Sequence, residues 1–211
     1  MKKKVLLFLF FALLTCGLQA QTETPLSATE SRKLTASLTQ AAASMQTLQC
    51  RFVQRKTSSM LAEPALAEGM MHYVAPDKMR WEYTAPYAFA LVVDGDRIVK
   101  EADGKAETTD VKKNRMYQGM ADLIMGGASG KRLFDTAAFD VAFYDENGFW
   151  RAEMTPKKRD MKRVLSRLVF RFDKTTGIIS RVAFVDSGGD ETSITFSDLQ
   201  LNTATEFGKR H

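Results

Sequence analysis

The sequence contains 211 residues, with 30 lysines and arginines, 25 aspartates and glutamates, and two cysteines. This length is enough for one domain with a sizeable hydrophobic core. Because Lys2, Lys3 and Lys4 carry three of the five excess positive charges, the rest of the chain is almost neutral, which argues against a nucleic-acid-binding domain.

The first 20 residues have the layout of a secretory signal peptide, in which lysines precede an apolar run. The run is about half as long as the ~20 residues that a transmembrane helix needs. We therefore expect cleavage near Ala20, export, and a single domain at residues 21–211. Acylation of Cys16 would instead anchor the protein to a membrane. We favour this less, because Thr15 stands where a lipoprotein signal normally has Gly, Ala or Ser.

A first helix is predicted for residues 28–46. Ser27 and Glu30 have the spacing of a capping box, in which each side chain accepts a hydrogen bond from a backbone N–H at the start of a helix. The apolar stripe that follows at helical spacing consists of Leu34, Leu38, Ala41, Met45 and Leu48. We expect this stripe to lie against an apolar surface.

After this helix the apolar pattern has a period of two, which predicts β-strands. We expect eleven strands, at residues 49–57, 66–75, 79–84, 88–94, 97–101, 106–110, 139–144, 149–155, 167–173, 178–185 and 192–199. Asp94-Gly95, Asn147-Gly148 and Thr176-Gly177 supply residues that tolerate the positive φ of tight hairpin turns. Because β-α-β alternation is missing, we predict a mainly β, antiparallel fold.

Two further helices are predicted between the strands. In residues 114–127 the apolar positions recur at helical spacing, and Gly126-Gly127 ends the segment. Its apolar face consists of Met116, Met120, Leu123 and Ile124. A second short helix is predicted at 157–165.

Apolar side chains of several strands are expected to gather on one concave face. Strand 79–84 alternates apolar and polar residues, whereas strand 88–94 is apolar on both faces, so we expect the latter to be covered on both sides. The candidates are Phe52, Met79, Trp81, Tyr83, Phe89, Leu91, Val93, Phe139, Val141, Phe143, Leu168, Phe170 and Phe172. Burial in an ordinary core is the alternative for each of them. The abundance of methionine and the Met-lined helix that ends in Gly-Gly favour an apolar cavity with a movable lid.

Four motifs are distinctive: Phe52-x-Gln54, Gly69, YVAPDKMRWEYTAP at 73–86 and LVVDGDRIV at 91–99. Together they resemble the LolA family, the periplasmic carriers of outer-membrane lipoproteins, over residues 28–200. The resemblance implies an unclosed antiparallel β-barrel of about eleven strands, with the N-terminal helix and short lid helices covering an apolar cavity. It also implies a monomeric periplasmic chaperone that binds lipoprotein acyl chains. Such a carrier takes its cargo from an inner-membrane ATP-driven exporter to the outer membrane, with or without an outer-membrane receptor.

We therefore expect the lipid-binding cavity at Phe52, Met79, Trp81, Tyr83, Phe89, Leu91, Val93, Phe143 and Phe170, and the lid at Met116, Met120, Leu123 and Ile124. By position, the resemblance itself supports Met79, Trp81 and the lid. The sequence departs from the family at one point. Well-studied carriers have an Arg immediately before the first proline of the motif, where it closes the lid by hydrogen bonds to backbone carbonyls, but here that residue is Ala75. Arg80 and Arg115 are candidate replacements for this latch.

Signals of catalysis and of cofactor or metal binding are weak. His72 has no nucleophile or ligand at a recognisable spacing, and GGASGKR at 126–132 departs from a phosphate-binding loop because Arg132 stands where Ser or Thr belongs. We expect no enzyme, no cofactor and no metal site, and Cys50 has no disulfide partner once the leader is removed. A carrier or sensor of another envelope lipid remains an alternative, and a secreted hydrolase is a less favoured one.

One charged segment has two interpretations. The basic run Lys157, Lys158, Arg159, Lys162 and Arg163 is typical of a solvated face. The alternative is attraction to anionic headgroups or to an acidic patch on a membrane partner.

Overall fold

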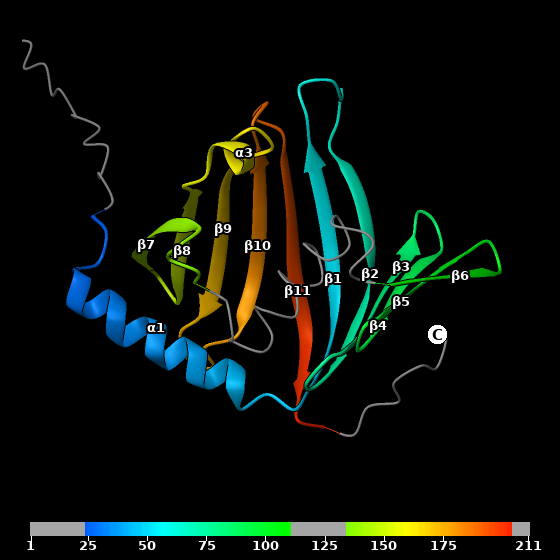
Figure 1. The fold of residues 1–211 in the computed structure, drawn as a ribbon, viewed down its shortest axis with the longest axis horizontal. Coiled ribbons are helices and arrows are strands. Elements are labelled where there is room, and N and C mark those ends of the chain that lie inside the picture. Colours follow the sequence, from blue (N-terminus) through cyan, green and yellow to red (C-terminus); the bar gives the residue numbers. More distant parts are fainter. Residues whose placement is uncertain (1–23, 111–133, 204–211) are drawn as a thin grey trace, which may run out of the picture.

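The computed structural model describes residues 24–110 and 134–203, which form one eleven-stranded antiparallel sheet and two helices (Figure 1). The elements are α1 (Ala28–Ala43), β1 (Thr47–Thr57), β2 (Ala65–Val74), β3 (Lys78–Ala85), β4 (Phe89–Asp94), β5 (Arg97–Ala102), β6 (Lys105–Asp110), β7 (Phe139–Glu146), β8 (Phe149–Pro156), α3 (Arg159–Lys162), β9 (Leu165–Asp173), β10 (Ile179–Asp186) and β11 (Glu191–Leu201). Neither helix of these residues has the length and apolar character that a membrane crossing requires.

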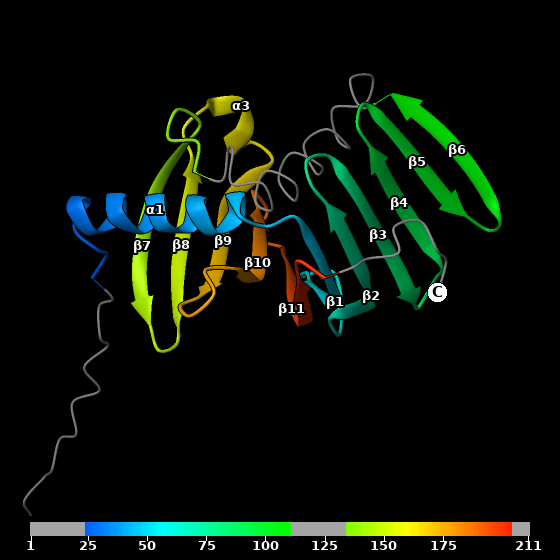
Figure 2. The ribbon, with the colours of Figure 1, turned by 90° about the horizontal axis from the view of Figure 1, so that it is seen from below.

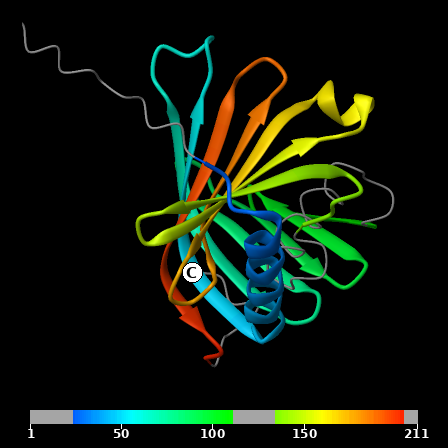
Figure 3. The ribbon, with the colours of Figure 1, turned by 90° about the vertical axis from the view of Figure 1, so that its left-hand side faces the viewer.

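The strand order is β6-β5-β4-β3-β2-β1-β11-β10-β9-β8-β7, so the first and last strands pair in the middle, and β6 and β7 are the edges of the sheet formed by the described residues. The predicted mainly β, unclosed fold is therefore confirmed. Helix α1 lies across β7 to β10 on one side of the sheet (Figure 2). Figure 3 shows the strands fanning out beside this helix. We call the side that faces α1 the inner face.

The local signals of the sequence are largely confirmed. Ser27 and Glu30 form the capping box, with the Glu30 Oε2 atom 2.9 Å from the Ser27 backbone nitrogen. Each predicted strand is present, with ends displaced by at most two residues. The turn glycines Gly95, Gly148 and Gly177 have φ of 58°, 78° and 71°, as tight hairpins require.

Two helix predictions were too long. Helix α1 ends at Ala43, and Leu48, which we had assigned to its stripe, lies instead on β1 opposite Tyr73 and Leu201. Leu48 fits both the helical spacing of the stripe and the alternating spacing of a strand. Its pairing with β2 and β11 places it on a strand. Helix α3 is shorter than 157–165, because both ends of the predicted segment have other partners: the Lys157 backbone N–H donates to the Ala138 oxygen, and Leu165 begins β9 opposite Asp186.

Strand β4 is covered on both sides, as its sequence predicted. Leu91 is fully buried on the inner face and Ala90 is 3% exposed on the outer face. The outer cover includes Arg80, whose guanidinium lies 2.8 Å from a Glu82 oxygen and 3.1 Å from a Glu101 oxygen. The predicted signal peptide and the predicted helix at 114–127 lie outside the described residues.

Gly69 has a clear structural reason. It lies opposite Phe52 on β1 and next to Tyr83 on β3, where the Phe52 ring covers the sheet. A Cβ atom at Gly69 would come within 1.9 Å of the Glu82 backbone oxygen and 2.7 Å of Phe52 Cζ. The glycine therefore lets an aromatic side chain pack directly on the backbone of β2.

We expect Gly69→Ala to lower the free energy of unfolding by about 1–3 kcal/mol, because the new methyl group meets rigid backbone. Urea denaturation measures this change. Gly188→Ala in the β10–β11 turn is the matched control: its nearest neighbour is a flexible Asp186 oxygen at 3.2 Å, and we expect a change below about 0.5 kcal/mol. Equal losses in the two variants would contradict the steric explanation.

Candidate functional site

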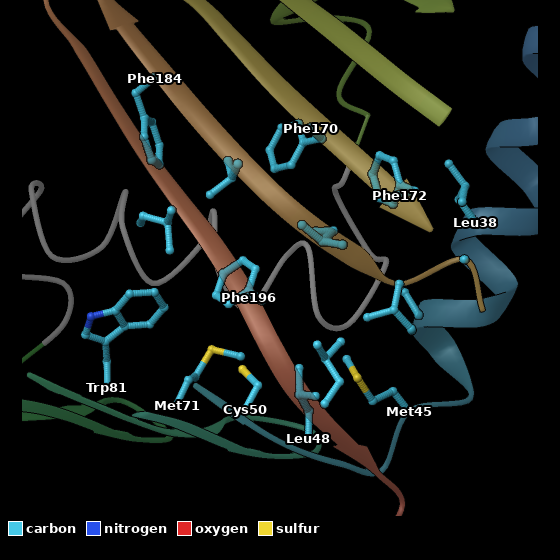
Figure 4. Close-up of a pocket in the computed structure, with 17 residues that line it drawn as sticks. Leu38, Met45, Leu48, Cys50, Met71, Trp81, Phe170, Phe172, Phe184 and Phe196 are labelled. Atoms are coloured by element: carbon cyan, nitrogen blue, oxygen red, sulfur yellow. The ribbon is translucent and has the colours of Figure 1, made fainter. Parts of the chain in front are cut away.

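An apolar pocket lies between α1 and the inner face (Figure 4). Its walls are formed by Leu38, Ala42, Met45, Leu48, Cys50, Met71, Trp81, Phe170, Phe172, Gly177, Ile178, Ile179, Val182, Phe184, Ile194, Phe196 and Leu199. The empty space between these side chains is about 720 Å³ when the part continuous with solvent is included. The pocket is thus apolar and continuous with solvent.

The spacing of residues along the helix and the strands places the side chains of the wall on one surface. Leu38 and Ala42 are one helical turn apart, so α1 turns both toward the sheet. On the strands every second residue faces inward, which aligns Phe170 of β9 with Val182 of β10 and Val182 with Ile194 of β11. Helix α1 and strands β1, β2, β3, β9, β10 and β11 each contribute between one and three side chains to this hydrocarbon surface.

An aromatic row leads from the pocket toward the surface. The Trp81 ring stacks on Phe52 with 4.1 Å between centroids and meets Phe196 edge-on at 6.2 Å. Phe52 in turn contacts Tyr83 at 5.2 Å, and Tyr83 contacts Tyr87, which is 53% exposed, at 5.5 Å. The rings thus form a continuous apolar path between the pocket and solvent.

Tyr83 supplies the polar end of this path. Its hydroxyl donates a hydrogen bond to Gln54 Oε1 at 2.8 Å, and burial raises the pKa of Tyr83. This contact satisfies both polar groups at the margin of an apolar surface. It also explains the Phe52-x-Gln54 spacing, because residues two apart on β1 share the inner face.

The predicted cavity residues fall into three groups. Trp81 and Phe170 line the pocket, and Phe52, Tyr83 and Phe89 belong to the ring contacts beside it. Met79, Leu91 and Val93 are at most 2% exposed farther along the same face of β3 and β4, and Phe143 on β7 meets Phe134 with 5.0 Å between ring centroids. The inner face thus gathers all of them, and the first group lies at the pocket itself.

Sequence reasoning missed much of the wall. Ile194 and Phe196 on β11, and Val182 and Phe184 on β10, line the pocket, as does Cys50 on β1. The period of two in β10 and β11 could have revealed these positions. What the sequence did not reveal is that β11 pairs with β1, which places the last strands beside Trp81.

Of the two candidate latch residues, Arg80 and Arg115, the structure describes Arg80. Arg80 points to the outer face, opposite Trp81, and is 3% exposed. Burial alone would lower the pKa of Arg80, but hydrogen bonds to Glu82 and Glu101 hold that pKa above its usual value. Ala75, at the position of the family's latch arginine, donates its backbone N–H to the Gln46 oxygen at 2.8 Å. Arg115 and the predicted lid residues Met116, Met120, Leu123 and Ile124 lie outside the described residues.

The chemistry of the pocket is that of an apolar binding surface. Its described wall has no charged side chain, and burial raises the pKa of the Cys50 thiol to about 12. Nor do the residues at 24–110 and 134–203 bring three or more His, Cys, Asp or Glu side chains together in a group that could hold a metal ion. The arrangement can hold hydrocarbon by non-directional contacts.

Comparison with known proteins agrees with this geometry. The model of the family "Outer membrane lipoprotein carrier protein LolA" matches residues 43–207. An outer-membrane lipoprotein carrier protein of Pseudomonas fluorescens is 30% identical over 188 residues, which are 88% of this chain and 86% of that protein. One of Nitrosomonas europaea is 29% identical over 160 residues, or 74% of this chain and 73% of that protein.

Among solved structures, a chain in the complex of Pseudomonas aeruginosa MucA and MucB matches with a TM-score of 0.50 at 13% identity. The match covers 84% of this chain and 59% of that chain. At this level of identity the likeness concerns the fold alone.

The raised pKa of Cys50 predicts slow alkylation. The thiolate is the reactive form, and a pKa of about 12 against an ordinary value of 9.0 leaves about a thousandfold less thiolate at pH 8. We expect iodoacetamide to label the folded protein that much more slowly than the urea-unfolded chain, with the rate rising as the pH approaches 12. Mass spectrometry of the peptide that contains Cys50 measures the rate. Labelling at equal rates in the folded and unfolded protein would show that the thiol is not buried in the wall.

Proposed function

Because this chain belongs to the LolA family of outer-membrane lipoprotein carrier proteins, we propose that it binds lipoprotein acyl chains on its inner face and carries them from the inner to the outer membrane. The family consists of carriers, so the chain is a binding protein and not an enzyme. The proposed compartment is the periplasm, which the predicted signal peptide at residues 1–20 and the names of the relatives both support. Residues 21–211 then form the carrier domain.

The observation that carries this proposal is the apolar pocket between α1 and the sheet. Each CH₂ group removed from water contributes about 0.8 kcal/mol, so three acyl chains represent tens of kcal/mol. A wall of aliphatic, aromatic and methionine side chains contributes this energy without requiring a particular headgroup. Since the contacts are individually weak, cargo can leave for a more apolar acceptor without any covalent step.

We infer that the pocket changes shape when an acyl chain enters. Part of its 720 Å³ is continuous with solvent, so an element of the wall has to move for the chain to be enclosed. Among the described residues α1 suits this role: its body lies on the sheet through side chains such as Leu38 and Ala42. Hydrogen bonds to other elements involve the backbone of its flanks, from Leu26 N–H to the Phe143 oxygen and from the Asn202 side chain to the Ser44 oxygen. Elements held by few buried contacts open at low cost in free energy. The segment 114–127 remains the second predicted cover.

The proposed lipid contacts follow the aromatic row. We assign the pocket part of the site to Trp81 and Phe170, and its extension to Phe52, Tyr83 and Phe89. The buried residues Met79, Leu91, Val93 and Phe143 would join it as the wall opens. Arg115 remains a candidate for the latch, whereas Arg80 is held on the outer face by Glu82 and Glu101, away from the pocket. The exporter and any outer-membrane receptor are partners that the family implies.

Filling the pocket from the helix side tests the proposal. Ala42→Phe places a ring against Leu38 and the inner face, and we expect it to weaken binding of a triacylated lipopeptide by at least about tenfold. Ala43→Phe is the matched control, because residue 43 is exposed on the same helix turn. Fluorescence titration measures the affinity, and circular dichroism and thermal unfolding check the fold. Equal affinity of a folded Ala42→Phe variant and the wild type would show that acyl chains bind elsewhere.

Co-purified cargo separates the alternative functions. We expect intact mass spectrometry under native conditions to show the protein with a triacylated polypeptide. A free lipid without polypeptide would instead favour a carrier or sensor of another envelope lipid. Protein that stays empty after exposure to both ligands would contradict a carrier function.

A further inference from the structure

The outer face of β8, β9 and β10 carries four arginines around one depression. We call Arg151, Arg167, Arg171 and Arg181 the arginine cluster. The depression has a volume of about 540 Å³, counting space open to solvent, and Val169 and Ala183 form an apolar floor. These residues alternate along the strands with Phe170 and Val182 of the inner face, so the cluster and the apolar pocket lie on opposite sides of the sheet.

The strand register sets three of these arginines side by side. Arg151 lies directly opposite Arg171, and Arg171 lies directly opposite Arg181. Like charges in directly opposed positions destabilise a sheet. Such a row is therefore costly unless anions neutralise it.

The protein supplies part of this neutralisation. Glu146 bridges two arginines, with oxygens 2.7 Å from Arg151 Nε and 2.8 Å from Arg171 Nε. Glu153 contacts Arg151 and lies 3.8 Å from Arg167. Glu191 accepts a hydrogen bond from Arg181 at 3.2 Å.

The neutralisation is incomplete. Among the residues that the structure describes, the ion pairs of the cluster join four guanidinium groups to three carboxylates, which leaves one positive charge in excess. Within the described residues, Arg181 Nε is buried and has no hydrogen-bond partner. A buried donor without an acceptor is costly, and a movement of the Arg181 side chain, which is 38% exposed, that brings Nε to an incoming oxygen atom would remove that cost.

We propose that the arginine cluster is a binding site for a phosphate oxyanion. Guanidinium groups present paired N–H donors that match the oxygens of phosphate, and several of them converge here from neighbouring strands. A phosphate oxygen that accepts from Arg181 Nε would satisfy the unpaired donor. Its negative charge would also offset the excess positive charge of the row.

Phosphate of two origins would fit this site: the free ion and the headgroup of a phospholipid. The basic run that includes Lys157, Lys158 and Arg163 joins β8 to β9, the strands that carry three of the four arginines. An anionic bilayer surface would meet both groups of charges. Because the cluster lies on the outer face, its binding does not depend on the acyl-chain pocket.

Titration with inorganic phosphate and co-sedimentation with vesicles test the two origins. The vesicles contain phosphatidylcholine alone or an equal mixture with phosphatidylglycerol. We expect Arg171→Gln and Arg181→Gln to weaken binding by at least about tenfold. Arg97→Gln is the matched control, because it removes the same charge from a side chain that is 72% exposed on β5. We expect it to change binding by less than about twofold.

Each outcome decides the proposal. Saturable binding of inorganic phosphate that needs Arg171 and Arg181 supports a site for the free ion, and binding only to phosphatidylglycerol vesicles with the same requirement supports a headgroup site. Failure to bind either probe overturns the proposal, as does an equal loss in the Arg97 variant. Binding of polyglutamate alone also overturns it, since the surface would then fit an acidic protein segment. Triacylated lipopeptide binding by Arg171→Gln and Arg181→Gln confirms that the variants fold.

Discussion

The structure depends on covering the inner face of a sheet that does not close. Within residues 24–110 and 134–203, β6 and β7 do not pair with each other, so the apolar face does not bury itself against its own strands as it would in a complete barrel. Leu38 and Ala42 of α1 cover part of it. Because apolar contact is non-directional, the surface that accepts a helix can equally accept hydrocarbon. The incomplete closure of the sheet and the proposed binding of lipid are therefore consequences of the same geometry.

The motif around Trp81 shows how one strand meets several demands. Trp81 and Tyr83 turn inward and begin the aromatic row, whereas Arg80 and Glu82 turn outward and form ion pairs over β4. Gly69 on the neighbouring strand leaves the space that the Phe52 ring occupies. A substitution that displaces the backbone of β3 would disturb both faces, because this strand positions the inward rings and the outward ion pairs.

The sequence predicted features that depend on short spacings better than features that depend on pairing. The capping box at Ser27, the turn glycines and all eleven strands follow from local patterns, and the structure confirms them. Leu48 was assigned wrongly because it satisfies both a helical and an alternating spacing. The contribution of Ile194 and Phe196 to the pocket was missed, since it requires β11 to pair with β1. The opposed positions of Arg151 and Arg171 likewise emerge only when the strand register is known.

Alternation along β9 gives the two proposed functions separate surfaces within three residues. Phe170 and Phe172 face the pocket, and Arg171 between them faces the arginine cluster. An acyl chain contributes about the same free energy per CH₂ in any apolar medium, so the pocket alone gives a carrier no preference for a particular place of release. A phosphate contact on the opposite face would bring the carrier to a bilayer without competing for the space that the cargo occupies. Charge would then determine contact with the membrane, and burial of hydrocarbon would determine retention of the cargo. These two interactions respond differently to salt.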